Sequence, residues 1–339
     1  MTFGYSVYFA EPDRNRIIRW SPDQGTAAVV AGEPTTPDRT QTLSEPYGLA
    51  WDSTGSLLIS DKFHQRIVRL RNGRLEELVL RDVDGHRQPR SDSRAGYKPS
   101  PPNSPTGLFS EPGGTILAAF FGEGTIYRIF PDGRLELVLG ITPSRSHHIG
   151  QVQETVAPGE VGNAALFRPV GVLRRSDGTM FFIERGYQVV REYHPSRGLR
   201  SVFPLSRQPE WRTRSAVPAE MSLSLYHPSY PASLALDSKD NLYLAEVGHR
   251  CVLAIDFAQG KVRRVLESRR KPGPNPGGIS ALTFGPDGTA WVIDAGAGVV
   301  EAYLPKPQGP WTPLGIRLSS VRGEPLTLPE GGAQIVTGR

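Results

Sequence analysis

The stretch PYGLAWDSTGSLLISDKFHQRIVRLRNGRLEELVL, residues 46–80, decides the fold of this chain. It contains four apolar or alternating runs, which are GLAW, LLIS, RIVRL and LEELVL. The segments between them are STGS, DKFHQ and RNG, rich in the Gly, Asn, Asp and Ser residues that favour turns. Short alternating runs bounded in this way are typical of β-strands joined by tight turns. The stretch therefore predicts a four-stranded antiparallel sheet.

The same pattern recurs along nearly the whole chain. The copies lie near residues 5–32, 46–80, 105–140, 169–203, 231–267 and 279–312. Aligned on the turn between the second and third strands, they match without a gap over 14 residues, from VYFAEPDRNRIIRW to AWVIDAGAGVVEAY. A repeated four-stranded sheet of this length is the signature of a β-propeller. We therefore expect one all-β propeller domain over residues 1–339.

The first copy lacks its first strand, and we expect the closing segment 313–339 to supply it. The stretch PLGIRLSSVRG, residues 313–323, resembles the first strand of the other copies. A blade built from both termini would close the ring and protect its sheet edges. The prediction is six blades. A partial further copy in PLTLPEGGAQIVTG, residues 325–338, leaves seven blades as the alternative.

Composition agrees with this architecture and excludes several classes. The 37 Gly and 31 Pro among 339 residues disfavour long helices. The single cysteine, Cys251, permits neither an intrachain disulfide nor a thiolate metal cluster. The amino terminus lacks the pattern of a signal peptide, and no apolar run is long enough to predict a membrane span. The net charge of +5 identifies no partner by itself.

The repeat resembles a known family. The consensus is P-x-G-(L/V)-x-x-(D/R)-x-x-G, then a strand, an acid and a short loop that ends in HR or HQR. It is similar to the NHL repeat of β-propellers, and HQRI (64–67) and HRCV (249–252) are nearest to the family's signature. The resemblance covers almost the entire chain. It implies a β-propeller whose first strands carry the P-x-G motif.

Two classes of propeller enzyme use site residues that this chain does not match. Its amidating lyases hold a catalytic zinc through histidines at the x of P-x-G. Here those positions are Tyr47, Thr106, Val170 and Ala232, so that zinc is not expected. Calcium-dependent lactonase propellers use channel Asn, Asp and Glu residues, and this chain has only six Asn. Neither chemistry transfers, and no cofactor is predicted.

Two sets of aligned positions are candidate ligand contacts. The first set is an acid after the second strand in five of six blades: Glu11, Asp61, Glu184, Glu246 and Asp294. These acids could face a cation, or they could accept amide hydrogens and fix the loops, as the family resemblance implies. The second set lies three residues further on: Arg14, His64, Glu123, Tyr187, His249 and Ala297. Its polar members could line a pocket for an acidic or planar ligand.

The long links between blades hold the remaining candidates. These links are 33–45, 81–104, 141–168, 204–230 and 268–278, all expected at the end of the blades that also bears the turns after the second strands. Within them, His147 and His148 are weak candidates for a metal site, and two solvated loop histidines are the simpler interpretation. Arg269, Arg270 and Lys271 form a basic patch that could bind phosphate groups.

These features favour a non-enzymatic propeller that binds a protein, peptide or glycan through its long-looped end. Variable loops on a rigid scaffold are where binding usually resides. One alternative is a metal-assisted hydrolase or lyase with its site at the top of the central channel. A second alternative is single-stranded RNA binding, for which the net charge of +4 over the long links provides weak support.

Overall fold

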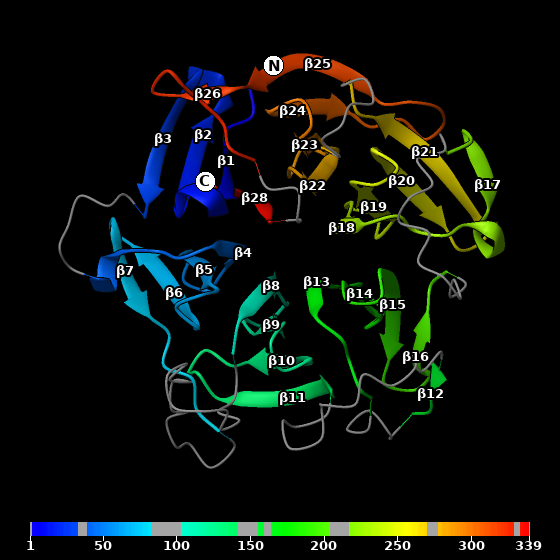
Figure 1. Ribbon diagram of the computed structural model, residues 1–339, viewed down its shortest axis with the longest axis horizontal. Coiled ribbons are helices and arrows are strands. Elements are labelled where there is room, and N and C mark those ends of the chain that lie inside the picture. The colour runs from blue at the N-terminus through cyan, green and yellow to red at the C-terminus, as the bar shows by residue number, and fades with distance from the viewer. Residues whose placement is uncertain are drawn as a thin grey trace. The chain divides into compact units, whose positions relative to one another are not determined.

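The computed structural model describes residues 2–32, 39–82, 103–140, 155–158, 164–203, 217–269, 277–328 and 333–338. Strands dominate this part of the chain, and its only helical elements are single 3-10 turns: η1 (Pro12–Arg14), η2 (Pro22–Gln24), η3 (Arg39–Gln41) and η5 (Leu223–Leu225). No helix among these residues is long and apolar enough to cross a membrane. The sheets are the blades of a six-bladed β-propeller with antiparallel strands, as the repeat predicted (Figure 1).

One compact unit of the chain contains blades 1, 5 and 6. Blade 1 consists of β28 (Ile335–Gly338), β1 (Ser6–Glu11), β2 (Arg16–Ser21) and β3 (Thr26–Ala31). Blade 5 consists of β18 (Pro231–Leu236), β19 (Leu242–Glu246), β20 (Cys251–Asp256), β21 (Lys261–Glu267) and the additional β17 (Glu220–Ser222). Blade 6 consists of β22 (Ile279–Phe284), β23 (Ala290–Asp294), β24 (Val299–Leu304) and β25 (Thr312–Leu318).

The other compact unit contains blades 2 and 3 and most of blade 4. Blade 2 consists of β4 (Pro46–Trp51), β5 (Leu57–Asp61), β6 (Arg66–Arg71) and β7 (Arg74–Glu77). Blade 3 consists of β8 (Pro105–Ser110), β9 (Ile116–Phe120), β10 (Thr125–Ile129) and β11 (Leu135–Gly140). Blade 4 consists of β13 (Pro169–Arg174), β14 (Met180–Glu184), β15 (Val189–His194), β16 (Gly198–Ser201) and the additional β12 (Thr155–Val156).

The strand that completes blade 1 differs from the one that the sequence predicted. Residues 313–323 were expected to pair with β1, but β25 pairs with β24 as the fourth strand of blade 6, and β26 (Ser320–Val321) forms a small hairpin with β27 (Glu324–Pro325). The partner of β1 is β28, with Phe9 opposite Ile335 and Val7 opposite Thr337. Figure 1 shows β28, in red, beside β1, in blue. The C-terminal copy thus completes blade 1, and the seven-blade alternative is wrong.

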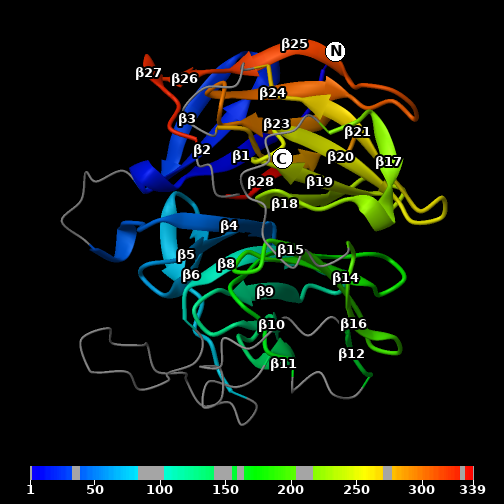
Figure 2. The ribbon, with the colours of Figure 1, turned by 45° about the vertical axis from the view of Figure 1, so that its right-hand side comes forward.

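Two links contribute strands that the repeat did not predict. β12 pairs with β16 on the outer edge of blade 4, and β17 pairs with β21 on the outer edge of blade 5. Both arise inside the links 141–168 and 204–230, which were interpreted as loops. An outer strand without a neighbour exposes unpaired backbone groups, so a short added strand covers part of that edge. Figure 2 shows β12 and β17 at the outer margins of their own blades.

The glycine of the P-x-G motif has a packing role. A Cβ atom on Gly48 in β4 would lie 1.8 Å from the Thr106 carbonyl oxygen in β8. A Cβ on Gly107 in β8 would lie 2.5 Å from the Gly171 backbone nitrogen in β13. The first strands of blades 2, 3 and 4 therefore approach backbone to backbone, which only a residue without a side chain permits.

Aromatic side chains fill the core of the unit that contains blades 6 and 1. Trp291 on β23 makes T-shaped contacts with Trp20 and Phe3, each with ring centroids 5.2 Å apart. Tyr5 accepts a hydrogen bond from the Trp291 indole and donates one to Asp287, at 3.1 and 2.7 Å. Burial raises the pKa of Tyr5. The amino-terminal residues are thereby anchored to blade 6 as well as to their own blade.

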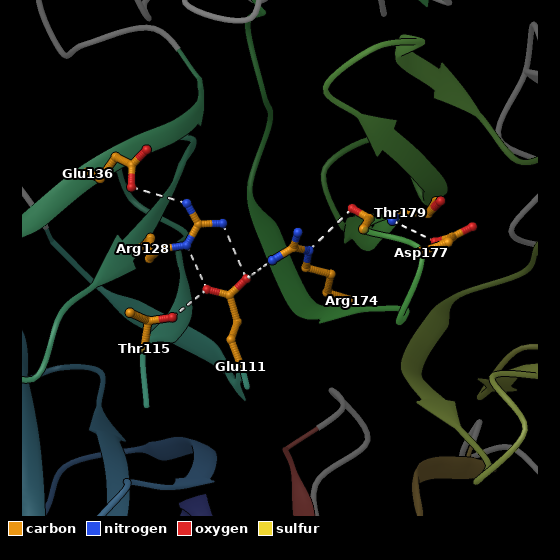
Figure 3. A network of polar contacts seen from close by, with 8 residues as sticks. Glu111, Thr115, Arg128, Glu136, Arg174, Asp177 and Thr179 are labelled. Atoms are coloured by element: carbon orange, nitrogen blue, oxygen red, sulfur yellow. Dashed lines mark hydrogen bonds and ion pairs between the residues drawn. The ribbon is translucent and has the colours of Figure 1, made fainter. Parts of the chain in front are cut away.

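An ion-pair network joins blades 3 and 4 at the end opposite the turns that follow the second strands. Figure 3 shows Glu111 between Arg128 of its own blade and Arg174 of the next, with Nε–Oε2 and Nη1–Oε1 distances of 2.7 and 2.8 Å. Thr115 donates a third hydrogen bond to Glu111. Burial alone would raise the pKa of Glu111, but these donors outweigh it and lower the pKa. The network holds neighbouring blades in register.

Replacement of Ile335 by alanine tests the closing strand. Ile335 is buried in the core cluster of blades 6 and 1, so Ile335→Ala should lower the free energy of unfolding by about 2–4 kcal/mol. The adjacent Val336 is only half-buried, on the opposite face of β28, and Val336→Ala should cost less than about 1 kcal/mol. Urea unfolding of the two variants measures the difference. Equal losses would contradict the assignment of β28.

Candidate functional site

In blades 2, 4 and 5, the acid that ends the second strand binds the link that enters the same blade. The acceptors are Asp61, Glu184 and Glu246, and the donors are the backbone N–H groups of Ser44, Phe167 and Ser229, at 2.7, 2.9 and 3.1 Å. Each donor lies two residues before the first-strand proline. The links and the turns after the second strands therefore meet at one end of each blade, which we call the turn end.

The residue just before that proline adopts a left-handed conformation. Its φ is 50° at Glu45, 53° at Ser104, 57° at Arg168 and 53° at Tyr230. Such a φ costs a non-glycine residue about 1–2 kcal/mol. Backbone hydrogen bonds from the facing turn help to stabilise it, including Arg185 N–H to the Arg168 carbonyl at 3.1 Å. The acid and these backbone bonds together form what we call the link clamp.

The buried acids in blades 1, 2 and 4 also have a cationic partner. Asp61 contacts the Nε of Arg66 at 2.7 Å and the Nδ1 of His64 at 2.8 Å. In blade 1, Glu11 contacts the Nε of Arg16 at 2.6 Å and accepts the Thr327 N–H at 2.7 Å. In blade 4 the pairing is looser, because the Nε of Arg191 lies 3.4 Å from Glu184. Burial raises the pKa of Glu184, and Arg191 opposes that effect.

Blade 5 replaces the arginine with a tyrosine and a histidine. The Tyr226 hydroxyl donates to Glu246, and His249 Nδ1 lies 2.7 Å from the same carboxylate oxygen and 2.9 Å from the hydroxyl. Burial is the main cause that raises the pKa of Tyr226. Tyr226 and Glu246 are both buried, and the His249 side chain is 11% exposed. This cluster fixes the link to the turn rather than facing solvent.

Blade 3 has Phe120 at the acid position, and Glu123 replaces the missing carboxylate. Its Oε1 accepts the Asn103 N–H at 3.0 Å, and Asn103 again lies two residues before the first-strand proline. Thr125 donates a longer hydrogen bond to it at 3.4 Å. Among the described residues, no arginine or lysine pairs with Glu123. Burial therefore raises its pKa to about 7.

In blade 6, the link and the turn are joined by backbone contacts at glycines. Asp294 accepts the Ala297 N–H within its own turn at 3.0 Å. The Ala295 N–H reaches the Gly278 carbonyl at 3.0 Å. A Cβ on Gly277 would lie 2.5 Å from the Gly296 Cα, so link and turn are in direct backbone contact.

The residues of the second candidate set make different contacts in different blades. His64 and His249 each bind the acid of their own blade, and Tyr187 packs against Phe167 with ring centroids 5.1 Å apart. Arg14 donates to Thr327 and pairs with Glu324. Among the residues that the structure describes, no three His, Cys, Asp or Glu side chains are grouped to hold a metal.

The candidates in the links are described only in part. Arg269 contacts Glu301 with an Nη1–Oε1 distance of 3.5 Å. Arg270, Lys271, His147 and His148 lie outside the described residues. The basic patch and the histidine pair therefore stay predictions.

The turn end of blades 2, 3 and 4 carries a group of aromatic and charged side chains that sequence reasoning missed. We call it the Lys62–Arg168 surface, and it consists of Glu45, Lys62, Phe63, Phe121, Phe167 and Arg168. Lys62 Nζ lies 5.0 Å from the Phe63 ring centroid, 5.3 Å from that of Phe121 and 2.8 Å from Glu45. Arg168 Cζ lies 5.4 Å from the Phe121 centroid and 5.2 Å from that of Phe167.

This surface was missed because the candidates were chosen at two aligned positions only. The turn residues between those positions, and the residues before each proline, were not compared. The available signal was the recurrence of aromatic residues in short polar turns, as at Phe63 and Phe121.

Comparisons with known proteins agree with the fold. No protein-family model and no curated protein matches the chain. Among solved structures it is similar to one from a nidogen–laminin complex, with a TM-score of 0.55 and 15% identity over 88% of this chain and 89% of that chain. A putative gluconolactonase has a TM-score of 0.50 and 16% identity over 85% and 81% of the two chains. For a gluconolactonase from Xanthomonas campestris the values are 0.50, 17%, 85% and 79%.

Identities this low show the β-propeller fold alone. They do not distinguish an enzyme from a binding protein, since both occur among these neighbours.

Replacement of Glu123 by glutamine tests the substitute acid of blade 3. The folded-state pKa of Glu123 is about 7, above the ordinary 4.5, so its contribution favours folding below pH 4.5 and declines as pH rises to about 7. Glutamine retains an acceptor for the Asn103 N–H but does not ionise. Glu123→Gln should therefore exceed the wild type in stability at pH 8, by up to about 3 kcal/mol, and match it near pH 4.5.

Urea unfolding at several pH values measures that difference. The exposed Glu76 on β7 provides the matched control, because Glu76→Gln removes one negative charge at the surface. A difference between Glu123→Gln and the wild type that does not change with pH would contradict the assignment.

Proposed function

We propose that this chain is an NHL-type propeller, a single domain over residues 1–339, that binds a partner protein or peptide through the turn ends of its blades. The observation that carries the proposal is the exposure of Phe63 on a turn whose backbone is held. Phe63 is 64% exposed, and the hydrogen bond from its N–H to the Ser44 carbonyl anchors it at 3.1 Å. Exposed aromatic residues on rigid supports are favoured as interface anchors.

The contacts of the acids that end the second strands support a binding function over catalysis. Glu11, Asp61 and Glu246 each accept hydrogen bonds from at least two protein donors, and Glu184 accepts the Phe167 N–H and forms an ion pair with Arg191. A buried carboxylate that is already engaged by protein donors is less available to coordinate a metal or to transfer a proton to a ligand. The metal-assisted hydrolase or lyase alternative would require these groups to exchange partners.

The positions of the family's zinc histidines also serve packing. Tyr47 is buried near the Lys62 ammonium, and the Thr106 hydroxyl lies 3.1 Å from the carbonyl oxygens of both Ala119 and Pro169. Val170 and Ala232 are buried. This arrangement supports a scaffold whose interior is structural and whose turn end is functional.

A protein partner is supported better than a glycan. Lys62 and Arg168 place positive charge beside Phe63 and Phe121, which suits a ligand with both apolar and anionic groups. The neighbour from the nidogen–laminin complex is a propeller crystallised with another protein, so the fold is compatible with this role.

Selection of peptides tests the proposed function. A display library of random peptides of about 12 residues is panned on the immobilised full chain, and enriched peptides are synthesised and titrated by calorimetry. We expect micromolar binders whose affinity falls by about tenfold or more in Phe63→Ser, because removal of one interface anchor costs about 2 kcal/mol.

Leu304→Ser is the matched control. Leu304 is 46% exposed and ends β24, at the blade end opposite the turn end. Its substitution should leave binding unchanged. Enrichment of no peptide, or equal losses in Phe63→Ser and Leu304→Ser, would contradict a binding role for the turn end.

A further inference from the structure

Arg168 has no ion-pair partner among the residues that the structure describes, and it lies on the Lys62–Arg168 surface. The residue is exposed, and no described carboxylate lies within ion-pair distance of its guanidinium. Its guanidinium lies over the rings of Phe121 and Phe167. Many other arginines of the same unit, such as Arg66, Arg69 and Arg128, already pair with an acid. Arg168 therefore keeps its bidentate donors available for an external anion.

The backbone beneath Arg168 is fixed before any ligand arrives. Its φ of 57° is held by the bond from the Arg185 N–H to its carbonyl, and the preceding N–H of Phe167 is bound by the buried Glu184. The two aromatic rings restrict the guanidinium further. A side chain ordered in advance loses little conformational entropy on binding, so more of the contact energy contributes to affinity.

The charge of the surface is positive. Lys62 and Arg168 contribute two cations, and Glu45 contributes the one acid that pairs with Lys62. The acids nearest in the clamp, Asp61 and Glu184, are buried with their own donors. An anionic ligand would therefore meet a complementary potential.

The rings favour a peptide over a nucleic acid. Proteins that bind single-stranded nucleic acids stack the bases on exposed aromatic faces. The Phe121 ring already has two cations beside it, Lys62 at 5.3 Å and Arg168 at 5.4 Å. Phe63 provides an exposed edge that an apolar side chain can cover, but a single ring is a poor platform for successive bases.

We infer that the Lys62–Arg168 surface receives an extended acidic segment of a partner protein, with a carboxylate on Arg168 and an apolar side chain on Phe63. This inference rests on the proposed function and specifies the chemistry of the partner. The carboxylate accepts the two parallel N–H groups of the guanidinium, and the apolar side chain removes the exposed ring of Phe63 from water.

Paired peptides test the inference with the full chain. The probes are synthetic peptides of about 12 residues that contain two Asp at varied spacings from a Leu or Phe. Each has a counterpart with Asn in place of Asp, and an oligouridylate of about 12 nucleotides is the nucleic-acid probe. We expect the best Asp peptide to bind about tenfold more tightly than its Asn counterpart, with weaker binding at high salt.

Two charge reversals locate the effect. Arg168→Glu should remove the preference for Asp over Asn. Arg74→Glu makes the same change on the outer strand β7 of the same unit, where Arg74 is exposed, and should leave the preference intact. Circular dichroism and thermal unfolding of both variants verify that they are folded.

Three results would overturn the inference. They are equal binding of Asp and Asn peptides at every spacing, a preference that survives Arg168→Glu, and tighter Arg168-dependent binding of the oligouridylate. If Asp and Asn peptides bind equally while the random library still yields peptides sensitive to Phe63→Ser, the acidic specificity fails and the proposed function stands. If the library also yields none, both fail.

Discussion

The buried carboxylate at the end of the second strand is the interaction on which the other features of the turn end depend. A charge removed from water must be met by donors, and in blades 1, 2, 4 and 5 the acid accepts an N–H from the preceding segment. A side-chain donor adds a second hydrogen bond in blades 1, 2 and 5, and in blade 4 the acid forms an ion pair with Arg191. This requirement brings the end of one segment to the turn of the next blade. The left-handed residue before the first-strand proline becomes tolerable because its neighbours are fixed on both sides.

The clamp also determines what the turn end can present. Once the backbone at Ser44 and Phe167 is bound to Asp61 and Glu184, the adjacent side chains project from fixed points. Arg168 and Phe63 are such neighbours, and their exposure follows from the position of the clamp rather than from local flexibility. The buried acids and the exposed side chains at the turn end are thus two consequences of one arrangement.

The sequence repeat was sufficient to predict the blades but not which segments pair with the edge strands of the blades. The strands and the six-fold repeat follow from local pattern and turn chemistry. Residues 313–323 were misassigned because their Pro, Gly and apolar alternation resemble a first strand, whereas the exposed edge of β24 is reached by a short hairpin connection. β28 lacks the P-x-G motif and has only IVTG to indicate a strand.

The sequence also did not show which residue takes over the role of another or which residues of different blades lie together. Glu123 performs in blade 3 the task of an acid three residues earlier, and the aligned column at that position shows only Phe120. The Lys62–Arg168 surface combines residues from three blades, and no single repeat contains its pattern. Both features depend on distances between side chains that are remote along the chain.

Amide hydrogen exchange of the link to blade 2 tests the central claim most directly. Mass spectrometry of peptides that cover residues 39–47 should show slow exchange at Ser44 in the wild type, because its N–H is bound to the buried Asp61. In Asp61→Asn, which weakens the charged acceptor, exchange at Ser44 should become about tenfold faster or more, while the amides of β5 and β6 keep their protection. Rapid exchange at Ser44 in the wild type, or no change in the variant, would contradict the account.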